Sequence, residues 1–290
     1  MSIKHSYLEQ TSKVLYDYIN NDGKGLPFNF TDSYGKISFG SGNGSKLSLF
    51  GFNFNDRVSY QALSDLRWTN YGGGGNFTIV PSGSAILMNG HFAASDYEIR
   101  LQEEGLEDRY SAVNGFNFGL DFKYVLGEDA VEYGLEVIGM RTDFQTFNAI
   151  DVQVGQEENT TEFAGYVDYR MNRGDWIFNP SMRMQYYSSL ARFRPEPRIG
   201  VKFKASERLR LKFAAGLYSQ NVISSNSDRD VVNLFYGFLS GPENLQRNLL
   251  TSNGDVQEVI HSLQTAEHLI SGFEFDLTER LNLNVEGYFK

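Results

Sequence analysis

The sequence predicts an all-β chain: an antiparallel up-and-down transmembrane β-barrel, incomplete, with about 12 strands of a larger barrel and short loop helices. Three observations predict it. Apolar and polar residues alternate with period two in many segments, short and long connections alternate between those segments, and the composition suits strands joined by tight turns. The 290 residues include 23 Phe, 17 Tyr and 29 Gly but only 6 Pro. Aromatic residues favour strands and glycine favours turns.

The period-two pattern is clearest in Leu209–Leu217, where apolar odd positions alternate with basic or small even positions. Successive side chains of a strand point to opposite faces, so this pattern predicts a strand with one apolar face. The same alternation occurs in residues 116–124, 176–186, 198–204 and 281–289. Alternation also continues through Leu66–Val80 and Val131–Met140. Strands of a soluble sandwich usually have about five or six residues, so this length favours strands that cross a membrane.

Two kinds of connection separate the predicted strands. Short turns rich in Gly, Pro, Asn, Asp or Ser lie at residues 41–45, 81–84, 127–130, 172–175, 204–208 and 276–280. Longer polar connections lie near residues 56–65, 95–109, 148–160, 188–196 and 221–266. Short turns on one side and long loops on the other are typical of outer-membrane barrels.

We therefore expect one partial barrel domain over residues 1–290. Its parts are a loop and helical lead-in at 1–27, strands at 28–221, a long extracellular loop at 222–264 and a strand hairpin at 265–290.

Some segments depart from the strand pattern. Tyr7–Ile19 has apolar residues at helical spacing, and Asp230–Leu239 is an apolar patch inside the longest connection. We expect each to form a short loop helix outside the membrane. Pro180 lies inside the alternating segment 176–186, and a paired central strand tolerates proline poorly. We expect a bulge or a different strand boundary there.

Composition excludes several classes of function. The formal net charge of -10 argues against nucleic-acid binding, which needs a basic surface. There are 0 Cys, so no disulfide framework or thiolate metal site is expected. Mean hydropathy is -0.38, which is compatible with a barrel because only every second residue of each strand faces lipid. No apolar run is long enough for a transmembrane helix, and no signal peptide is visible at the N-terminus.

No motif points to catalysis, a cofactor or a resident metal. Gly72–Gly75 lacks the lysine and hydroxyl residue of a phosphate-binding loop, so strand glycines are expected. The four histidines are His5, His91, His261 and His268. His261 and His268 are seven residues apart but have no Cys or close His partner, so a metal site there is disfavoured. Adjacent carboxylates occur at 103–104, 107–108 and 157–158, where solvated loop tips are favoured over cation binding.

Several segments resemble a known family. SIKHSYLEQT, LPFNFTDSYGKISF and KLSLFGFNFNDRVSY resemble the mid-barrel of TonB-dependent outer-membrane receptors. The most similar type carries an N-terminal carboxypeptidase-like regulatory domain. PEPRIGVKFKASERLRLKFAAGLYSQN and LQTAEHLISGFEFDLTERLNLNVEGYFK resemble the strand pairs that flank a large extracellular loop in that family. The similarity covers residues 1–24, 28–100 and 195–290.

The resemblance implies energy-coupled uptake of a siderophore, glycan or similar nutrient across the outer membrane of a Gram-negative bacterium. Such receptors also have a signal peptide, a TonB box and a plug domain, which we expect to be missing from this chain. The implied partners are outer-membrane lipid, a small-molecule or oligomeric nutrient, and the TonB complex through the missing N-terminal part. A surface lipoprotein is a further candidate partner.

The longest loop is the best candidate for ligand contact, because ligands reach such receptors from outside. Its mixed polar and aromatic candidates are Asp228, Arg229, Asp230, Tyr236 and Asn244.

Two other functions stay open. A passive outer-membrane porin would have strands directly after its signal peptide, with no plug. A soluble all-β carbohydrate-binding module would fold alone in water with a cooperative melt.

Overall fold

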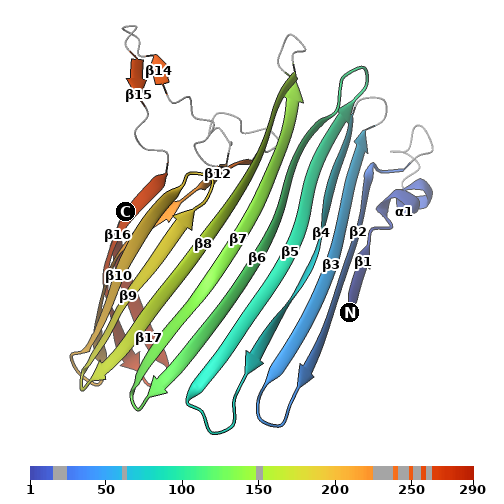
Figure 1. The fold of residues 1–290 in the computed structure, drawn as a ribbon. Helices are drawn as coiled ribbons and strands as arrows, with labels where there is room; N and C mark the ends of the chain where they lie inside the picture. Colours follow the sequence, from blue (N-terminus) through green and yellow to red (C-terminus); the bar gives the residue numbers. More distant parts are fainter. Residues whose placement is uncertain are drawn as a thin grey trace.

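The protein forms one large curved antiparallel sheet (Figure 1). The computed structural model describes residues 1–15, 25–60, 64–147, 153–224, 238–240, 248–250, 256–258 and 263–290. Within these residues the sheet has 13 strands, in the order β1 to β11 followed by β16 and β17. Every strand pairs with its nearest neighbour along the chain, apart from the step from β11 to β16 across the longest connection. This up-and-down order confirms the predicted fold class.

The long strands of the sheet make up most of the described residues. Their bounds are β1 (Ser2–His5), β2 (Phe28–Gly40), β3 (Lys46–Tyr60), β4 (Ser64–Ile79), β5 (Ile86–Glu103), β6 (Arg109–Leu126), β7 (Asp129–Phe147), β8 (Gln153–Arg173), β9 (Trp176–Tyr187), β10 (Arg192–Lys204), β11 (Leu209–Gln220), β16 (Gln264–Thr278) and β17 (Leu281–Phe289). Two small strand pairs lie in the longest connection, β12 (Val222–Ser224) with β13 (Phe238–Ser240) and β14 (Asn248–Leu250) with β15 (Val256–Glu258). The one helix described is α1 (Leu8–Leu15), which lies inside the segment predicted to be helical.

Among the described residues, no helix is both long and apolar enough to cross a membrane.

The predicted short turns lie together at one end of the sheet (Figure 1). Four of them require glycine, because Gly44, Gly83, Gly127 and Gly174 have φ angles of 89°, 74°, 66° and 60°. Residues with a Cβ avoid this left-handed region, whereas glycine enters it without steric penalty. We call the half of the sheet beside these turns the turn half; in β6, for example, it comprises Phe116–Leu126. We call the other half the loop half; in β6 it comprises Arg109–Gly115.

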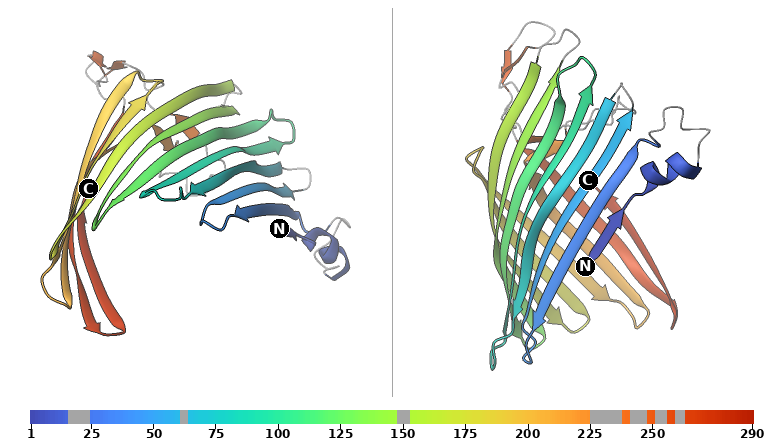
Figure 2. Two further views of the ribbon diagram at one scale, coloured as in Figure 1. Left: turned by 60° about the horizontal axis from the view of Figure 1, so that its bottom comes forward. Right: turned by 90° about the vertical axis from the view of Figure 1, so that its right-hand side faces the viewer.

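The two faces of the sheet can be told apart by the longest connection. Asn221, just before β12, donates a hydrogen bond from Nδ2 to Thr160 Oγ1 of β8 over 2.8 Å. Strand β13 lies against β6, β7 and β8, on the concave side of the sheet (Figure 2). Side chains on the face of Thr160 therefore point inward. Registered neighbours share a face and alternate residues do not, so the pairing assigns each strand residue to a face.

The outward face of the turn half is an apolar band. In β6 it carries Phe116, Phe118, Leu120, Phe122 and Tyr124, in register with Val131 to Val137 of β7. Corresponding runs are Tyr71–Ile79 in β4, Ile86–Ala94 in β5, Phe163–Met171 in β8, Trp176–Tyr186 in β9, Phe193–Phe203 in β10 and Leu209–Leu217 in β11. Their lengths match the roughly 9–11 residues that a tilted strand needs to cross a bilayer.

Polarity reverses in the loop half. There the outward positions of β5 are Asp96, Glu98 and Arg100, whereas the inward Ile99 is only 1% exposed. Leu66 of β4 is likewise inward and buried. Polar outside and apolar inside is the arrangement of a sheet in water. The strands therefore continue past the apolar band. Beyond it the outward residues named here are charged and the inward ones are apolar.

This reversal explains the largest difference between prediction and structure. The sequence assigns 56–65 and 95–109 to long polar connections, but β3, β4, β5 and β6 together include most of those residues. The charged residues there occupy the outward face of paired strands. At the N-terminus, within the expected lead-in 1–27, Ser2–His5 forms β1 and pairs with Thr31–Tyr34.

Pro180 lies within β9 with no register shift toward either neighbour, so the expected bulge is absent. The pairing of β8 with β9 instead omits Tyr169 and Arg170 opposite the proline, because proline has no N–H to donate. The helix predicted for Asp230–Leu239 is also wrong at Phe238 and Leu239. These residues form β13 and pair with Val222–Ser224, while residues 230–237 lie outside the described residues.

Glycines let neighbouring strands approach in the turn half, as predicted for Gly72–Gly75. A Cβ on Gly74 would lie 2.3 Å from the backbone oxygen of Phe92 and 2.8 Å from Ala93 Cα. Only a backbone shift could relieve these contacts. By contrast, a Cβ on Gly165 would come no nearer than 3.5 Å to Leu135 Cδ2, which is ordinary packing.

Gly74→Ala should therefore destabilise the folded sheet by about 1–3 kcal/mol, the usual effect of overpacking. Gly165→Ala in β8 is the matched control and should change stability by less than about 0.5 kcal/mol. The midpoint of thermal unfolding of the detergent-solubilised protein measures both. Equal midpoints for the two variants would contradict the close approach at Gly74.

The apolar band predicts a strong dependence on depth and face. Leu120→Arg would put a charge near the middle of the band and should destabilise the protein in bilayers by about 2–4 kcal/mol. Ala112→Arg lies on the same face of β6, beyond the band and directly opposite Glu98 and Asp143, so it should be nearly neutral. Unfolding of both variants in lipid vesicles, followed by denaturant titration, tests this. Similar losses at the two positions would place the membrane elsewhere.

Candidate functional site

The inward face of the turn half is lined by polar and charged side chains, which we call the polar wall. Its members are His91, Asn117, Asp121, Lys123, Glu132, Glu136, Glu162, Tyr166, Asp168, Arg170, Asn179, Arg183, Gln185, Lys202, Arg210, Lys212, Glu274, Asp276, Asn284 and Glu286. They come from strands β5 to β11, β16 and β17. The same alternation that turns apolar residues outward therefore turns these groups toward the space that the sheet encloses.

A continuous hydrogen-bonded chain crosses five strands of the polar wall. His91 Nε2 is 2.7 Å from Asn117 Oδ1, and Asn117 Nδ2 donates to Glu136 Oε1 over 3.3 Å. Arg183 Nη2 donates to the other oxygen of Glu136 over 2.6 Å.

The chain then continues along β9 and back to β8. Arg183 Nε donates to Gln185 Oε1 over 3.0 Å, and Gln185 Nε2 donates to Glu162 Oε2 over 2.9 Å. Each side chain is fixed by the next, so the chain presents a preorganised polar surface.

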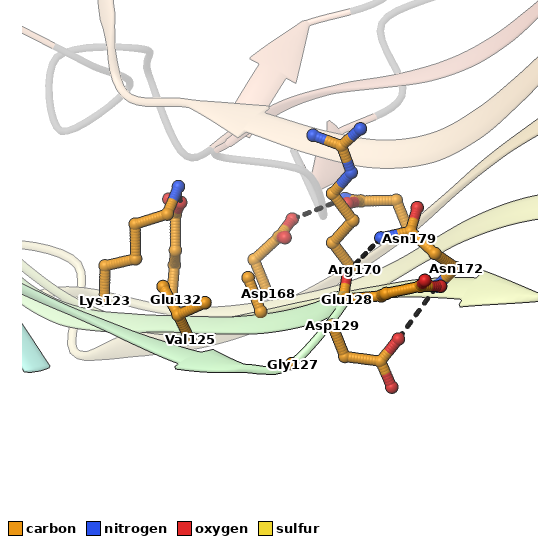
Figure 3. Close-up of a pocket in the computed structure, with 11 residues that line it drawn as sticks. Lys123, Val125, Gly127, Glu128, Asp129, Glu132, Asp168, Arg170, Asn172 and Asn179 are labelled. Atoms are coloured by element: carbon orange, nitrogen blue, oxygen red, sulfur yellow. Dashed lines mark hydrogen bonds and ion pairs between the residues drawn. The ribbon is translucent and has the colours of Figure 1, made fainter. Parts of the chain in front are cut away.

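A cavity of about 430 Å³ lies at the end of the polar wall nearest the short turns. Figure 3 shows Lys123, Glu132, Asp168 and Arg170 rising from one side of the sheet, while Asp129 points to the other side. Lys123 and Glu132 form an ion pair. The cavity therefore offers both signs of charge to whatever fills the interior.

Asn179 of β9 completes this cavity by donating from Nδ2 to Asp168 Oδ2 over 2.7 Å (Figure 3). Nearby, the Tyr166 hydroxyl donates to Asp121 Oδ1. Gly134 leaves room for this contact, because a Cβ there would lie 2.6 Å from Asp121 Oδ1.

Glu274 of β16 is the centre of a basic cluster on the opposite part of the wall. It accepts from Lys202 Nζ at 2.8 Å and Arg210 Nε at 2.9 Å, and Lys212 Nζ lies 3.2 Å away. Lys202 and Lys212 are directly opposite each other on β10 and β11. Like charges in such positions repel, so the shared carboxylate is what makes the arrangement tolerable.

Two more carboxylates complete this cluster. Arg210 Nη2 donates to Asp276 over 2.7 Å, and Lys212 Nζ donates to Glu286 over 2.5 Å. The three cations thus face three carboxylates, and the cluster is close to neutral.

Polar anchors hold the start of the longest connection onto the inner face. Tyr187 and Ser219 hydroxyl oxygens are 2.8 Å apart, and the Ser219 N–H donates to Glu196 Oε1 over 2.8 Å. Thr160, which accepts from Asn221, also contacts Ser189 at 3.1 Å. These contacts fix the point at which the chain leaves β11.

The candidate ligand-contact residues lie outside the described residues. These are Asp228, Arg229, Asp230, Tyr236 and Asn244, so they stay predictions. The structure does show that β13 of the same connection, paired with β12, lies on the inner side of the sheet.

The histidines do not come together. His5 contacts Thr31 on β2, His91 belongs to the polar wall, and His268 packs against the Tyr218 ring at 4.6 Å; His261 lies outside the described residues. In the described part of the chain, no group of three or more His, Asp or Glu side chains is placed to hold a metal ion.

Adjacent carboxylates at 157–158 point to opposite faces. Glu157 pairs outward with Arg141 at 2.9 Å, whereas Glu158 is inward and buried. The two cannot chelate one cation. Sequence reasoning recognised the polar face of the strands but named none of its residues as a site. Tracing the alternation from one turn to the next would have grouped them.

No protein-family model matches the chain, and no curated protein matches it in sequence. Solved structures do match. The siderophore receptor PirA from Pseudomonas aeruginosa is 12% identical, with a TM-score of 0.63 over 90% of this chain and 45% of that one. The outer membrane transporter YddB from Escherichia coli is 11% identical, with a TM-score of 0.55 over 87% and 43%. The alcaligin outer membrane receptor FauA from Bordetella pertussis is 8% identical, with a TM-score of 0.63 over 90% and 43%.

These matches establish the fold. The chain has the fold of outer-membrane receptor and transporter barrels, and its incomplete sheet corresponds to part of one. It spans less than half the length of each of these structures.

The polar wall generates a prediction about stability. Arg183 and Glu136 are 23% and 24% exposed, so Arg183→Met would leave a half-buried carboxylate without its cation. We expect a loss of about 1–3 kcal/mol in the free energy of unfolding.

Arg141→Met is the matched control, because its pair with Glu157 is about half exposed and faces outward. Such exposed pairs contribute about 0–1 kcal/mol. Denaturant unfolding at neutral pH measures both variants. A smaller effect at Arg183 than at Arg141 would mean that the polar wall is as solvated as the outer surface.

Proposed function

We propose that the chain is the barrel portion of a TonB-dependent outer-membrane receptor, of the type with an N-terminal carboxypeptidase-like regulatory domain. Its function is energy-coupled uptake of a siderophore, glycan or similar nutrient. One observation carries the proposal: the sheet has an apolar band outside and a preorganised polar wall inside, within a fold shared with solved receptors. A passage for a polar ligand through a bilayer needs this combination.

The apolar band also argues against a soluble binding module. Phe118 and Leu135 are large, outward and 45% and 61% exposed. Rows of such side chains around a sheet would aggregate in water. In the outer membrane of a Gram-negative bacterium they would contact lipid.

In this proposal the chain positions groups and performs no chemistry. The ligand arrives at the loop half, where Asp228, Arg229, Asp230, Tyr236 and Asn244 make the first contacts. The polar wall then holds an interior plug domain through paired charges such as Arg183–Glu136. Because these charges are already paired, the plug can move along the wall without leaving a bare charge behind.

Energy enters through partners of this chain. The TonB complex pulls on an N-terminal segment of the longer protein, which rearranges the plug. A surface lipoprotein that covers the loop half is a further proposed partner. The solved structures that match are receptors and transporters, and we assign the chain no catalytic role.

Uptake measurements on cells that express the full-length protein test this function. The probes are a panel of radiolabelled ferric siderophores and fluorescent oligosaccharides. We expect one probe class to bind at the surface and to enter only while the inner membrane is energised. Uptake that continues after an uncoupler is added, with steady ion conductance in planar bilayers, would instead identify a passive porin.

The ligand-contact residues give a second prediction. Replacing Asp228, Arg229 and Asp230 with serine, together with Tyr236→Ala and Asn244→Ala, should weaken surface binding of that probe by at least about tenfold, since a few contacts dominate most interfaces. Glu207→Ser, in a short turn at the opposite end, is the control and should leave binding unchanged. Unaltered binding by the loop variant would move the contact site to another part of the protein.

A further inference from the structure

Three arginines form a row across neighbouring strands in the loop half. Arg57 of β3 is directly opposite Arg67 of β4, and Arg67 is directly opposite Arg100 of β5. All three lie on the outward face, in register with the outward Tyr110 of β6. Adjacent strands are about 4.8 Å apart, so this arginine row spans roughly 10 Å.

Such a row is unfavourable without compensation, because like charges directly opposite each other destabilise a sheet. Asp65 compensates two of the three arginines: Arg57 Nε is 3.0 Å from Asp65 Oδ2 and Arg67 Nε is 3.2 Å from Oδ1. Arg100 Nε donates to Glu98 over 2.9 Å, and Nη1 lies 3.4 Å from Asp108. The carboxylates therefore hold the three guanidinium groups in place.

The contacts with the carboxylates leave some guanidinium N–H groups exposed to the surroundings. The side chains of Arg57, Arg67 and Arg100 stay 51%, 52% and 42% exposed. Among the described residues, Arg57 and Arg67 bond to Asp65 through Nε and Nη2, and Nη1 of each takes part in no hydrogen bond. Planar guanidinium groups with free N–H donors are well suited to bind phosphate oxygens in pairs.

The row lies just beyond the apolar band. In β4 the band ends at Tyr71, and Arg67 follows two outward positions later. At about 3.3 Å per residue and a tilt of about 45°, that is roughly 9 Å above the hydrocarbon. The headgroup layer extends about 5–8 Å from the hydrocarbon on each side. Long arginine side chains reach that distance by bending toward it.

We propose that the arginine row binds phosphate groups of lipid headgroups in the leaflet next to the loop half. Arg57 and Arg67 would each donate from Nη1 to a phosphate oxygen, while their Nε edges stay on Asp65. Arg100, whose three nitrogens already contact Glu98 and Asp108, would add positive charge beside them. This site depends on the membrane placement in the proposed function but not on uptake. It can therefore be tested on purified protein with no nutrient present, and failure of uptake would leave it standing.

The experiment titrates the full-length protein in detergent with dioctanoyl phosphatidic acid and follows binding by calorimetry. Dioctanoylglycerol, which has the same acyl chains and no phosphate, is the ligand control. The test variant replaces Arg57, Arg67 and Arg100 with glutamine. We expect it to bind phosphatidic acid at least about tenfold more weakly, because charge-assisted hydrogen bonds to phosphate are lost.

Arg141→Gln is the matched control variant. Arg141 is outward and 51% exposed, with its own carboxylate Glu157, but it lies outside the row. Its affinity should stay within about twofold of the unaltered protein. Equal losses for this variant and the triple variant would overturn the proposal, as would equal binding of the two lipids by the unaltered protein.

Asp65→Asn keeps the proposal testable if the triple variant fails to fold. Removing this carboxylate frees two guanidinium groups, so affinity for phosphatidic acid should rise about threefold. Unchanged affinity would mean that the row is only an internal ion-pair network. Inorganic phosphate serves as competitor: displacement of the lipid at equal concentration would identify a site for a free anion instead of a lipid headgroup.

Discussion

Backbone hydrogen bonding within the sheet is the constraint on which the rest of the structure depends. In hydrocarbon every N–H and C=O must find a partner inside the protein, and a paired strand satisfies its own while leaving side chains free to differ on its two faces. The strands β4 to β11 use that freedom in the turn half, with apolar residues outward and polar residues inward. The apolar band and the polar wall are therefore two consequences of one alternation.

The polar wall is stable because its charges compensate one another. Glu274 is shared by Lys202, Arg210 and Lys212, and Glu136 is held by Arg183 and Asn117. Removing charges from water is costly unless each is paired and hydrogen-bonded. A wall built this way keeps its shape whether the interior holds protein, ligand or water.

Sequence reasoning succeeded where one alternation runs unbroken between two turns, as in 116–124 and 209–217. It failed where the outward residues of a strand change from apolar to charged. Along β5 the outward residues change from Phe92 to Asp96 and Glu98 within a few positions. Such a change looks like the end of a strand, although the hydrogen-bonded pairing continues to Glu103. Local patterns cannot reveal this, because only the membrane boundary explains the switch. The residues proposed for ligand contact in the longest connection are a separate case, since they lie outside the described residues.

The start of the longest connection lies against the inner face of the loop half. Beyond the band, strands β6 to β8 present an inward surface on which Ser111, Thr142 and Thr160 are almost fully buried, and β13 lies against these strands. Strand β11 ends at Gln220, near the top of the band, and the chain then turns inward through Asn221. It returns against the tall strands as β13. The inner face of the sheet itself therefore holds Asn221 and β13 at the place where the longest connection leaves β11.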